Sequence, residues 1–579
     1  MIQGHSTSAA TNRKLAYAII LIIVAYGATA VAGLPQRGTQ LIVTESNHSD
    51  EPHEVLEDGQ PDSRVEPGEE QSPPEVGSAS FDENGDHEVR KAISGEQSGG
   101  GPPRAAEFEL GRHDLNSATT HEAIPPPLWT VLPFVVLLGA IALFPLFRLT
   151  ERWWESNLHR FYVAAGLGLI TLLYYAIFHR SAVEGHWPAH HLVEWPAETI
   201  FSWRVPLEVA ANALLREYVP FIVLLFSLYT LSGGVRIEGD LPAKPFTNVM
   251  FIGVGGLLAS FIGTTGAAML LIRPLLETNR LRRYRVHTVV TFIFVVCNCG
   301  GCLLPIGDPP LFLGYLNGVP FFWTLTLWQP WLFVNSSLLL IYWAWDGLYY
   351  YKNESAADIR RDELEQRPLR ISGLGLHLPL LIAVILSVAT LDPSKAFLGT
   401  EWHPWMYLRE VVQLGLVAIS LLAGAHWVRE HNHFSYHAIL EVAALFVGIF
   451  LCMQPALQIL NVHGGEMGLS TPMQFFLATG GLSSVLDNAP TYVVFFETAM
   501  TYGGDLNVRG GSLNSRLLVA ISLGAVFMGA MTYIGNGPNF MVKAIAETAG
   551  VRMPSFFGYL KYSFGILLPV LLLTAWLFL

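Results

Sequence analysis

Side chains that carry hydroxyl, amide or carboxylate oxygens interrupt the apolar sequence of this chain at four places. All of them lie near helix-breaking Gly or Pro residues, and they are Thr264, Thr265, Asn298, Asp308, Ser483, Ser484, Asp487, Asn488, Asn536 and Asn539. Hard cations take oxygen ligands of this kind. Polar groups within long apolar sequence are costly and indicate function. The set therefore predicts a binding site for Na⁺, with no cofactor.

Asp308 and Asp487 are the titratable members of this set. Burial in apolar surroundings favours the neutral carboxyl group, so each residue could release a proton when a cation binds and regain it afterwards. Asp308 begins an Asp-Pro-Pro sequence, which could also be a solvated turn at a membrane surface. Asp487 could instead cap a helix, a role that is compatible with ion binding.

The four breaks form two pairs, which indicates an internal duplication. Residues 258–270 align without a gap with residues 482–494. Residues 306–310 align in the same way with residues 534–538, at nearly the same offset along the chain. Duplicated membrane sequence with helix-breaking polar motifs is typical of secondary transporters.

The composition predicts an all-α polytopic membrane protein. Hydrophobic residues make up 51% of the chain, charged residues only 14%, and the mean hydropathy is +0.39. Long apolar runs recur from Trp129 to Leu579. A bilayer core of ~30 Å takes ~20 apolar residues per helix, so these runs are expected to span the lipid bilayer. The four cysteines lie in apolar sequence and imply no disulfide framework.

The formal net charge of −13 belongs mainly to one segment, residues 33–127. This segment is rich in Glu, Asp, Ser, Gly and Pro, and it predicts an acidic disordered tail on the extracytoplasmic side. The acidity of a tail indicates no nucleic-acid partner for the membrane body. Residues 1–32 combine Arg13 and Lys14 with an apolar run and a small-residue end, as in a secretory signal; an uncleaved anchor is the alternative.

The charges that flank residues 247–276 predict a re-entrant hairpin. Lys244 precedes this segment and Arg280 follows it, and positive residues mark the cytoplasmic side at both ends. Two full spans would need ~40 residues, which exceeds the length available. The segment is therefore expected to enter from the cytoplasm, turn at residues 263–266 and return.

A second hairpin, residues 471–500 with its tip at residues 486–490, is expected to enter from the opposite face. The helices at 287–305 and 516–533 are expected to break at the Gly- and Pro-containing motifs that follow them. These features predict inverted repeats with two re-entrant helical hairpins and broken helices. Repeat 1 covers 128–350, a cytoplasmic linker covers 351–371, and repeat 2 covers 372–579.

Three histidines, His186, His190 and His191, lie in a loop that we expect on the outer face, together with Trp187 and Trp195. A metal site is one interpretation of this group. An interfacial loop with tryptophan anchors is the interpretation that we favour from sequence.

The motifs carry a family resemblance. The chain resembles the ion-transporter superfamily, and most of all its NhaD-type sodium/proton antiporters and citrate-transporter-like proteins. The resemblance lies in residues 298–301 with 305–308 and in residues 483–490. The resemblance covers residues 129–579. Pro309 and Pro310 stand where the NhaD pattern continues with threonines, and residues 535–539 are more similar to anion-transporting branches.

The resemblance implies a scaffold domain that forms a homodimer and a transport domain that contains both hairpins. It implies a sodium/proton antiporter of a bacterial-type inner membrane, in which Asp308 and Asp487 couple Na⁺ to protons. The alternative is a citrate or other carboxylate symporter, or an arsenite-type anion transporter. An enzyme is not expected, because the body has neither His-Glu-x-x-His nor Gly-x-Ser-x-Gly.

We expect Thr247→Cys and Arg280→Cys to react with a membrane-impermeant maleimide from the cytoplasmic face only. Thr471→Cys and Thr501→Cys should react from the opposite face only, because each pair marks the two ends of a re-entrant hairpin. Labelling of right-side-out and inverted vesicles measures this. Reaction of the first pair from different faces would contradict the hairpin.

Overall fold

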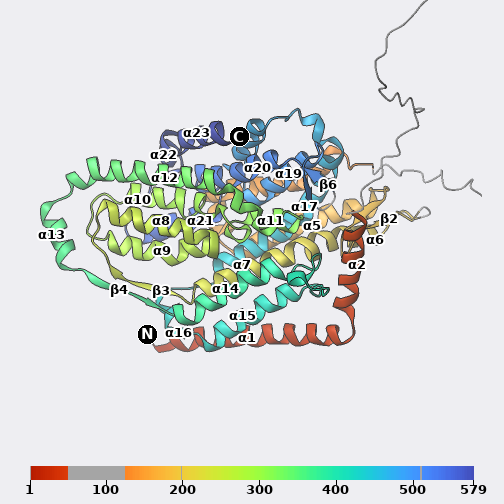
Figure 1. Ribbon diagram of the computed structural model, residues 1–579, viewed down its shortest axis with the longest axis horizontal. Helices are drawn as coiled ribbons and strands as arrows, with labels where there is room; N and C mark the ends of the chain where they lie inside the picture. The colour runs from red at the N-terminus through yellow and green to blue at the C-terminus, as the bar shows by residue number, and fades with distance from the viewer. Residues whose placement is uncertain (1, 50–123, 197–198, 509–510) are drawn as a thin grey trace, which may run out of the picture. The chain divides into compact units, whose positions relative to one another are not determined.

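The computed structural model describes residues 2–49, 124–196, 199–508 and 511–579, and helices dominate it (Figure 1). Within these residues, six helices are long and apolar enough to cross a membrane: Thr11–Val31, Asn157–Ile177, Arg204–Ser232, Pro245–Ile262, His437–Met467 and Phe556–Phe578. Shorter apolar helices accompany them. The chain is a multi-pass membrane protein, as its composition predicts.

The first half of the body runs as far as the ribbon strand β4. Its elements are α3 (Leu132–Leu143), α4 (Arg148–Trp154), α5 (Asn157–Ile177), β1 (Val183–Gly185), β2 (His191–Val193), α6 (Arg204–Ala211), α7 (Val219–Ser232), β3 (Arg236–Asp240), α8 (Pro245–Ile262), α9 (Thr264–Thr278), α10 (Val286–Val295), α11 (Pro309–Leu316), α12 (Trp328–Trp345), α13 (Ala356–Leu364) and β4 (Arg367–Ser372). A π-helical segment, Asn212–Tyr218, joins α6 to α7, and together they make one span, Arg204–Ser232.

The second half runs to the C-terminal residue of the chain. Its elements are α14 (Leu374–Thr390), α15 (Leu408–Ala423), α16 (His426–His431), α17 (His437–His463), α18 (Pro472–Ser483), α19 (Asn488–Met500), β5 (Leu506–Val508), β6 (Gly511–Leu513), α20 (Ser515–Met528), α21 (Gly537–Thr548), α22 (Phe556–Tyr562) and α23 (Leu568–Phe578).

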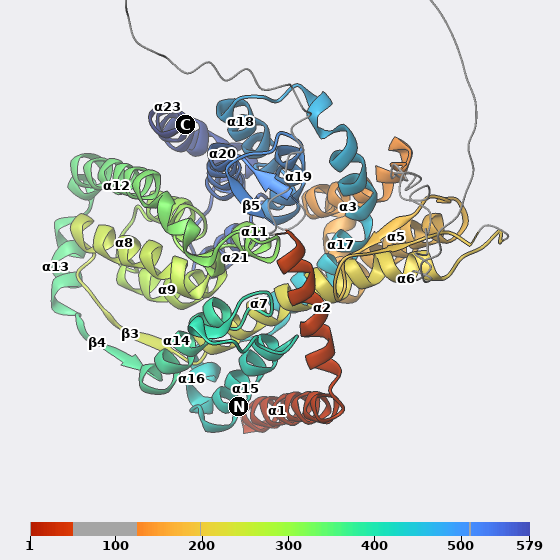
Figure 2. The ribbon, with the colours of Figure 1, turned by 45° about the vertical axis from the view of Figure 1, so that its right-hand side comes forward.

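The N-terminal segment forms two helices, α1 (Ile2–Val31) and α2 (Leu34–Ser49). Ala16 and Ile19 of α1 are buried against α15, beside which α1 lies in Figure 2. The start of the predicted disordered tail is therefore helical. The Thr39 hydroxyl of α2 donates to the Pro404 carbonyl (3.2 Å) and accepts from the Met406 N–H (2.9 Å), which holds this helix. Residues 50–123 of the predicted tail lie outside the described residues.

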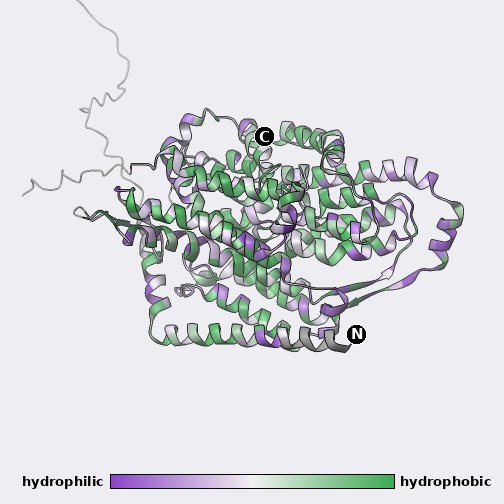
Figure 3. Ribbon diagram, turned by 180° about the vertical axis from the view of Figure 1, so that it is seen from behind, coloured by the Kyte–Doolittle hydropathy of each residue, from purple (hydrophilic) through white to green (hydrophobic). Residues whose placement is uncertain are grey.

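Short antiparallel ribbons, β1–β2, β3–β4 and β5–β6, add to the helical architecture. In the β3–β4 ribbon Ile237 lies opposite Ile371, so the predicted linker 351–371 pairs with the first half. The linker also contains α13, and its Asp362 carboxylate accepts a hydrogen bond from the Ala243 N–H (2.8 Å). These contacts give the linker regular structure, and Figure 3 shows the hydrophilic character of α13 and the ribbon.

Both predicted hairpins are pairs of packed helices. A single residue, Gly263, separates α8 from α9, and its φ of 79° is a conformation that glycine adopts without strain. Residues 484–487 separate α18 from α19. Thr471 and Gln474 form a capping box at the start of α18, and Asp487 caps α19. The re-entrant entry of these hairpins into a membrane stays a prediction.

The broken helices end earlier than the sequence predicts. The expected helix 287–305 stops at Val295, the end of α10, and the expected helix 516–533 stops at Met528, the end of α20. At the first break, the Asn298 amide donates to the Ile293 carbonyl (2.8 Å), with backbone angles of −142° and −84° at Asn298. A side chain that binds a helix carbonyl competes with the backbone hydrogen bonds, which favours an early end.

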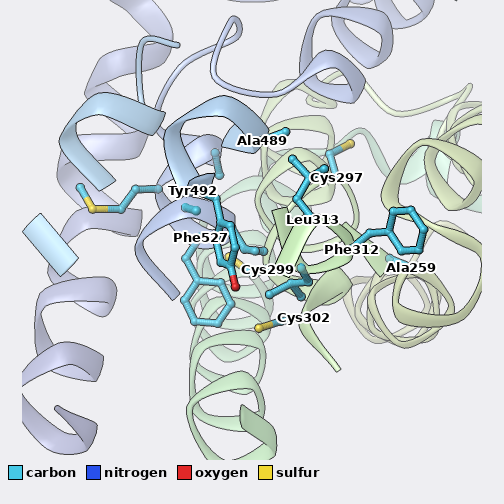
Figure 4. Packing of buried hydrophobic residues seen from close by; sticks show 14 of the residues in the cluster. Ala259, Cys297, Cys299, Cys302, Phe312, Leu313, Ala489, Tyr492 and Phe527 are labelled. Carbon is cyan, nitrogen blue, oxygen red and sulfur yellow. The ribbon is translucent and has the colours of Figure 1, made fainter. Parts of the chain in front are cut away.

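Buried apolar side chains of both halves meet beside these breaks. Figure 4 shows Cys299 and Cys302 of the first half close to Tyr492 and Phe527 of the second, and all four are buried. A Cβ atom at Gly314 would lie 2.3 Å from the Tyr492 hydroxyl oxygen. The absence of a side chain at Gly314 therefore lets α11 pack closely on α19.

A buried ionic cluster ties the end of α12 to the loop between α9 and α10. The Arg282 guanidinium donates to both oxygens of Asp346 (2.8 and 2.5 Å), and Asp346 also contacts His287 Nε2 (2.9 Å) and the Tyr342 hydroxyl (3.1 Å). The side chain of Arg282 is 4% exposed and that of Asp346 is fully buried. Bidentate geometry and additional partners are the conditions under which a buried ion pair is well compensated.

The variant Asp346→Ala should lower the free energy of unfolding by about 3–5 kcal/mol, because it removes the bidentate partner of a buried charge and leaves Arg282 only its longer contact with Glu354 (3.5 Å). Glu365→Ala is the matched control, since Glu365 pairs with the exposed Arg361 (2.7 Å) and such pairs contribute only about 0.2–1 kcal/mol. Unfolding of the purified protein in detergent measures both. Equal losses of stability in the two variants would contradict this role of the cluster.

Candidate functional site

Asp308 is the centre of the polar cluster, and its side chain is almost completely buried at 1% exposure. Its Oδ1 accepts a hydrogen bond from the Thr264 hydroxyl (2.8 Å) and a longer one from the Asn536 amide (3.4 Å). Its Oδ2 accepts from the Asn488 amide (2.6 Å). This burial contradicts the alternative of a solvated turn.

Four elements position these groups. Thr264 is the first residue of α9 and Asn488 the first residue of α19, so each lies at the tip of one hairpin. Asp308 precedes α11 and Asn536 precedes α21, so each lies at one break. Pro309 and Pro310 occupy the first turn of α11, where the missing N–H groups need no partner. The Asp308 side chain does not cap α11 and is directed to the hairpin tips instead.

A chain of buried amides extends from Asp308 through the breaks. The Asn536 amide donates to Asn298 Oδ1 (3.2 Å) and to the Cys297 carbonyl (3.0 Å). Asn298 in turn donates to Asn539 Oδ1 (2.8 Å), and Asn539 donates to the Thr532 carbonyl (3.0 Å). Buried polar groups of this kind are expensive unless paired, so the network specifies how the two breaks meet.

The contacts around the site follow the internal alignment found in the sequence. Thr264 and Asn488 are aligned residues of the two hairpin segments, and each donates to one oxygen of Asp308. Asp308 and Asn536 are aligned residues of the two breaks, and they contact each other. Residues that correspond in the two repeats therefore lie together at this site.

A pair of serines shows the same correspondence. The Ser260 hydroxyl donates to the Gly300 carbonyl (2.6 Å), and the Ser484 hydroxyl donates to the Met528 carbonyl (3.2 Å). The two serines are aligned residues of the hairpin segments. Their acceptors, Gly300 and Met528, are separated by the same offset as the aligned residues of the two breaks. Each hairpin is thus linked to the broken helix of its own half by an equivalent hydrogen bond.

Glycines allow the breaks to fold tightly. A Cβ atom at Gly307 would lie 2.2 Å from the Gly301 carbonyl oxygen, and a Cβ atom at Gly535 would lie 2.6 Å from the Gly529 carbonyl oxygen. These distances are too short for any side chain. Both breaks therefore need glycine at the same relative position, which keeps Asp308 and Asn536 close to the hairpin tips.

The remaining predicted residues lie beside the network. The half-buried Asp487 accepts a hydrogen bond from the Ala489 N–H (3.1 Å), as a helix cap does. Ser483 donates to the Ala525 carbonyl (2.7 Å) and Ser484 to the Gly480 and Met528 carbonyls. Thr265 is half-buried. The structure brings none of these four side chains onto Asp308 by a hydrogen bond between described residues, and their part in ion binding stays a prediction.

One oxygen of the site has the character of a cation ligand. Asn488 Oδ1 is buried and has no hydrogen-bond partner among the described residues, although the amide nitrogen of the same side chain binds Asp308. A buried acceptor without a donor is costly, and a hard cation would satisfy it. Asp308, Asn488 and Thr264 are therefore the residues that could hold Na⁺ together.

Two glutamates outside the predicted set of site residues line a cavity. Glu217 and Glu497 line a cavity of about 540 Å³, together with Arg216. Glu217 Oε2 is buried. Its counterpart in the second repeat, Glu441, instead forms an ion pair with Arg160 (2.7 Å). The sequence signal for Glu217 and Glu497 was a glutamate within or beside an apolar run.

Comparison with known families identifies the chain. Residues 179–579 match the family described as "Putative citrate transport". The match covers more than half of the chain, which therefore belongs to this family of citrate-transporter-like proteins and is a transporter. No curated protein matches the sequence.

We expect Gly307→Ala and Gly535→Ala to destabilise the protein by at least the ~1–3 kcal/mol that is typical of overpacking, since backbone oxygens cannot move away easily. Gly537→Ala is the control, because a Cβ atom there would meet nothing within 4 Å. Thermal unfolding of the three purified variants measures this. A loss in Gly537→Ala as large as in the other two would contradict the tight packing of the breaks.

Proposed function

We propose that the chain is a sodium/proton antiporter in which Asp308 carries Na⁺ and a proton in turn. One observation carries the proposal: a single buried carboxylate receives side-chain donors from both hairpin tips and from the second break. An ionisable group in this position is costly, and transport is the usual reason for one within membrane-spanning sequence.

Competition for one carboxylate supplies the exchange. Ionised Asp308 would hold Na⁺ together with the free amide oxygen of Asn488 and the hydroxyl oxygen of Thr264. A proton needs the same ionised carboxylate, so Na⁺ binding releases a proton and protonation releases Na⁺. Exchange requires no covalent step and no cofactor.

The internal repeat supports an alternating-access arrangement. The equivalent contacts of the two halves fit repeats of opposite orientation, with hairpins that open to opposite faces. Thr264 and Asn488 hold the same carboxylate from different hairpins. Movement of either hairpin would therefore remove one ligand and expose Asp308 to one side of the membrane.

Asp487 is the second carboxylate proposed to carry protons. It lies next to Asn488 at the tip of the second hairpin, where it caps α19 through the Ala489 N–H. An ionised carboxylate offers about four lone-pair positions as hydrogen-bond acceptors. Capping of α19 uses only one of them, on Oδ1. The other positions remain for a proton or a cation that enters along this hairpin.

The cavity lined by Glu217 and Glu497 supports cations as substrates. Its lining includes the carboxylates of Glu184, Glu217 and Glu497, against the guanidinium of Arg216. An acidic, low-dielectric wall raises the local concentration of cations and opposes the entry of a free polyanion.

A carboxylate symporter is the second candidate, and the family description favours it. Citrate would have to bind beside Asp308, so cations would have to accompany it to offset the repulsion between carboxylates. Flux that appears only when citrate is added would identify this function.

The acidic tail outside, the bacterial-type inner membrane and the homodimer are likewise proposals that rest on the resemblance to transporters of this superfamily.

The variant Asp308→Asn should abolish proton movement driven by NaCl in everted vesicles, because the amide cannot exchange a proton. In the unaltered protein the apparent affinity for Na⁺ should rise with pH, since fewer protons then compete for the carboxylate. A pH-sensitive dye inside the vesicles measures both.

Asp358→Asn, which alters an exposed carboxylate on α13, is the control and should transport normally. Proton flux that persists in Asp308→Asn would remove Asp308 from the proposed mechanism. Unaltered vesicles that respond only to added citrate would replace antiport by carboxylate symport.

A further inference from the structure

A second cluster of ligand-type side chains lies on the wall of the cavity that Glu217 and Glu497 line. Glu184 on β1 and His186 and His190 in the loop after it bring one ligand atom each within 4.8 Å of one another. Both His Nε2 atoms lie 3.7 Å from Glu184 Oε2. The side chains are 31–46% exposed, so an ion in solution can reach them.

The backbone that carries this cluster is held in place by one side chain. The Asn212 amide donates to the Glu184 carbonyl (2.8 Å), and Asn212 Oδ1 accepts from the His186 N–H (2.7 Å). Asn212 begins the π-helical segment between α6 and α7, and it is buried. This clamp fixes two of the three candidate ligands relative to the helix that also carries Glu217.

The spacing suits a tetrahedral metal ion. With bonds of ~2.0–2.1 Å, tetrahedral ligand atoms lie about 3.4 Å apart, so small side-chain rotations would close the triad around an ion. Two imidazoles and one carboxylate are a ligand set that binds Zn²⁺ and leaves a fourth position open. Mg²⁺ and Ca²⁺ prefer sites made only of oxygen ligands, which this set does not provide.

We propose that Glu184, His186 and His190 form a site for a transition-metal ion of the Zn²⁺ type, and that the bound ion inhibits transport through the adjoining cavity. The three residues share the cavity wall with Glu217, Glu497 and Arg216. A divalent ion there offsets the negative charge of the three glutamates and weakens their attraction for an incoming cation.

Another histidine of the same ribbon provides a matched control. His191 on β2 pairs with Glu208 (3.4 Å) and lies outside the triad. His191→Ala therefore removes one imidazole from the ribbon without touching the proposed ligands. Loss of zinc binding in this variant equal to that in the triad variants would contradict a specific site.

Equilibrium binding of ZnCl₂ to the purified full chain tests the site without any transport. Titration calorimetry at about pH 7.5, where an unperturbed imidazole is neutral, should show saturable binding that weakens at least tenfold in His186→Ala, His190→Ala and Glu184→Gln, but not in His191→Ala. Excess MgCl₂ should not compete. Unchanged affinity in the double variant His186→Ala/His190→Ala would overturn the assignment.

The spectrum of bound Co²⁺ provides a second test of the ligand set. Co²⁺ bound to this triad should give the visible absorption of tetrahedral coordination in the unaltered chain and lose it in His190→Ala. An octahedral spectrum, or one that persists in that variant, would contradict the proposed geometry.

Inhibition is measured separately, in vesicles that carry the unaltered chain or His186→Ala. ZnCl₂ on the face that bears the β1–β2 ribbon should slow transport of the unaltered chain, and His186→Ala should need at least ten times more zinc. If zinc binds the purified chain but slows both equally, the inhibitory role is wrong. Absence of all transport would instead count against the proposed antiport, since the binding experiment does not depend on it.

Discussion

One buried carboxylate needs hydrogen-bond donors, and this need determines how the two halves of this protein meet. Asp308 is almost fully buried, and no single element surrounds it with enough donors among the described residues. Thr264 of the first hairpin, Asn488 of the second and Asn536 of the second break supply them together. An ionised carboxylate in an apolar interior is stable only with such partners. Both hairpin tips and both breaks must therefore converge on this residue.

The duplication gives this convergence a simple geometry. Thr264 and Asn488 correspond in the two repeats, as do Asp308 and Asn536, so equivalent residues face each other at one point. The glycines at 307 and 535 permit the same close backbone approach in each half. Only one half carries the carboxylate, however, since Asn536 replaces it in the other. The two halves thus supply corresponding residues to the site, but only the first supplies a carboxylate at this position.

Sequence patterns predicted the components of this site better than their contacts. The positions of the hairpin tips followed from flanking charges and from the alignment of the two repeats, and the structure has helix ends at both. The early ends of α10 and α20 were not predicted, because they depend on Asn298 and on contacts between residues far apart in sequence. The choice of Asn488 rather than Asp487 as the partner of Asp308 is also a tertiary effect. Glu217 was outside the predicted set of site residues because its cavity is lined by several distant segments.

Proton release on binding of Na⁺ to the purified protein is the decisive measurement. NaCl is added to the protein in weakly buffered detergent solution, and a pH indicator reports released protons. We expect release from the unaltered chain that saturates with Na⁺, falls as the starting pH rises, and disappears in Asp308→Asn. Saturable Na⁺ binding without proton release at any starting pH would show that the two ions do not share the carboxylate of Asp308.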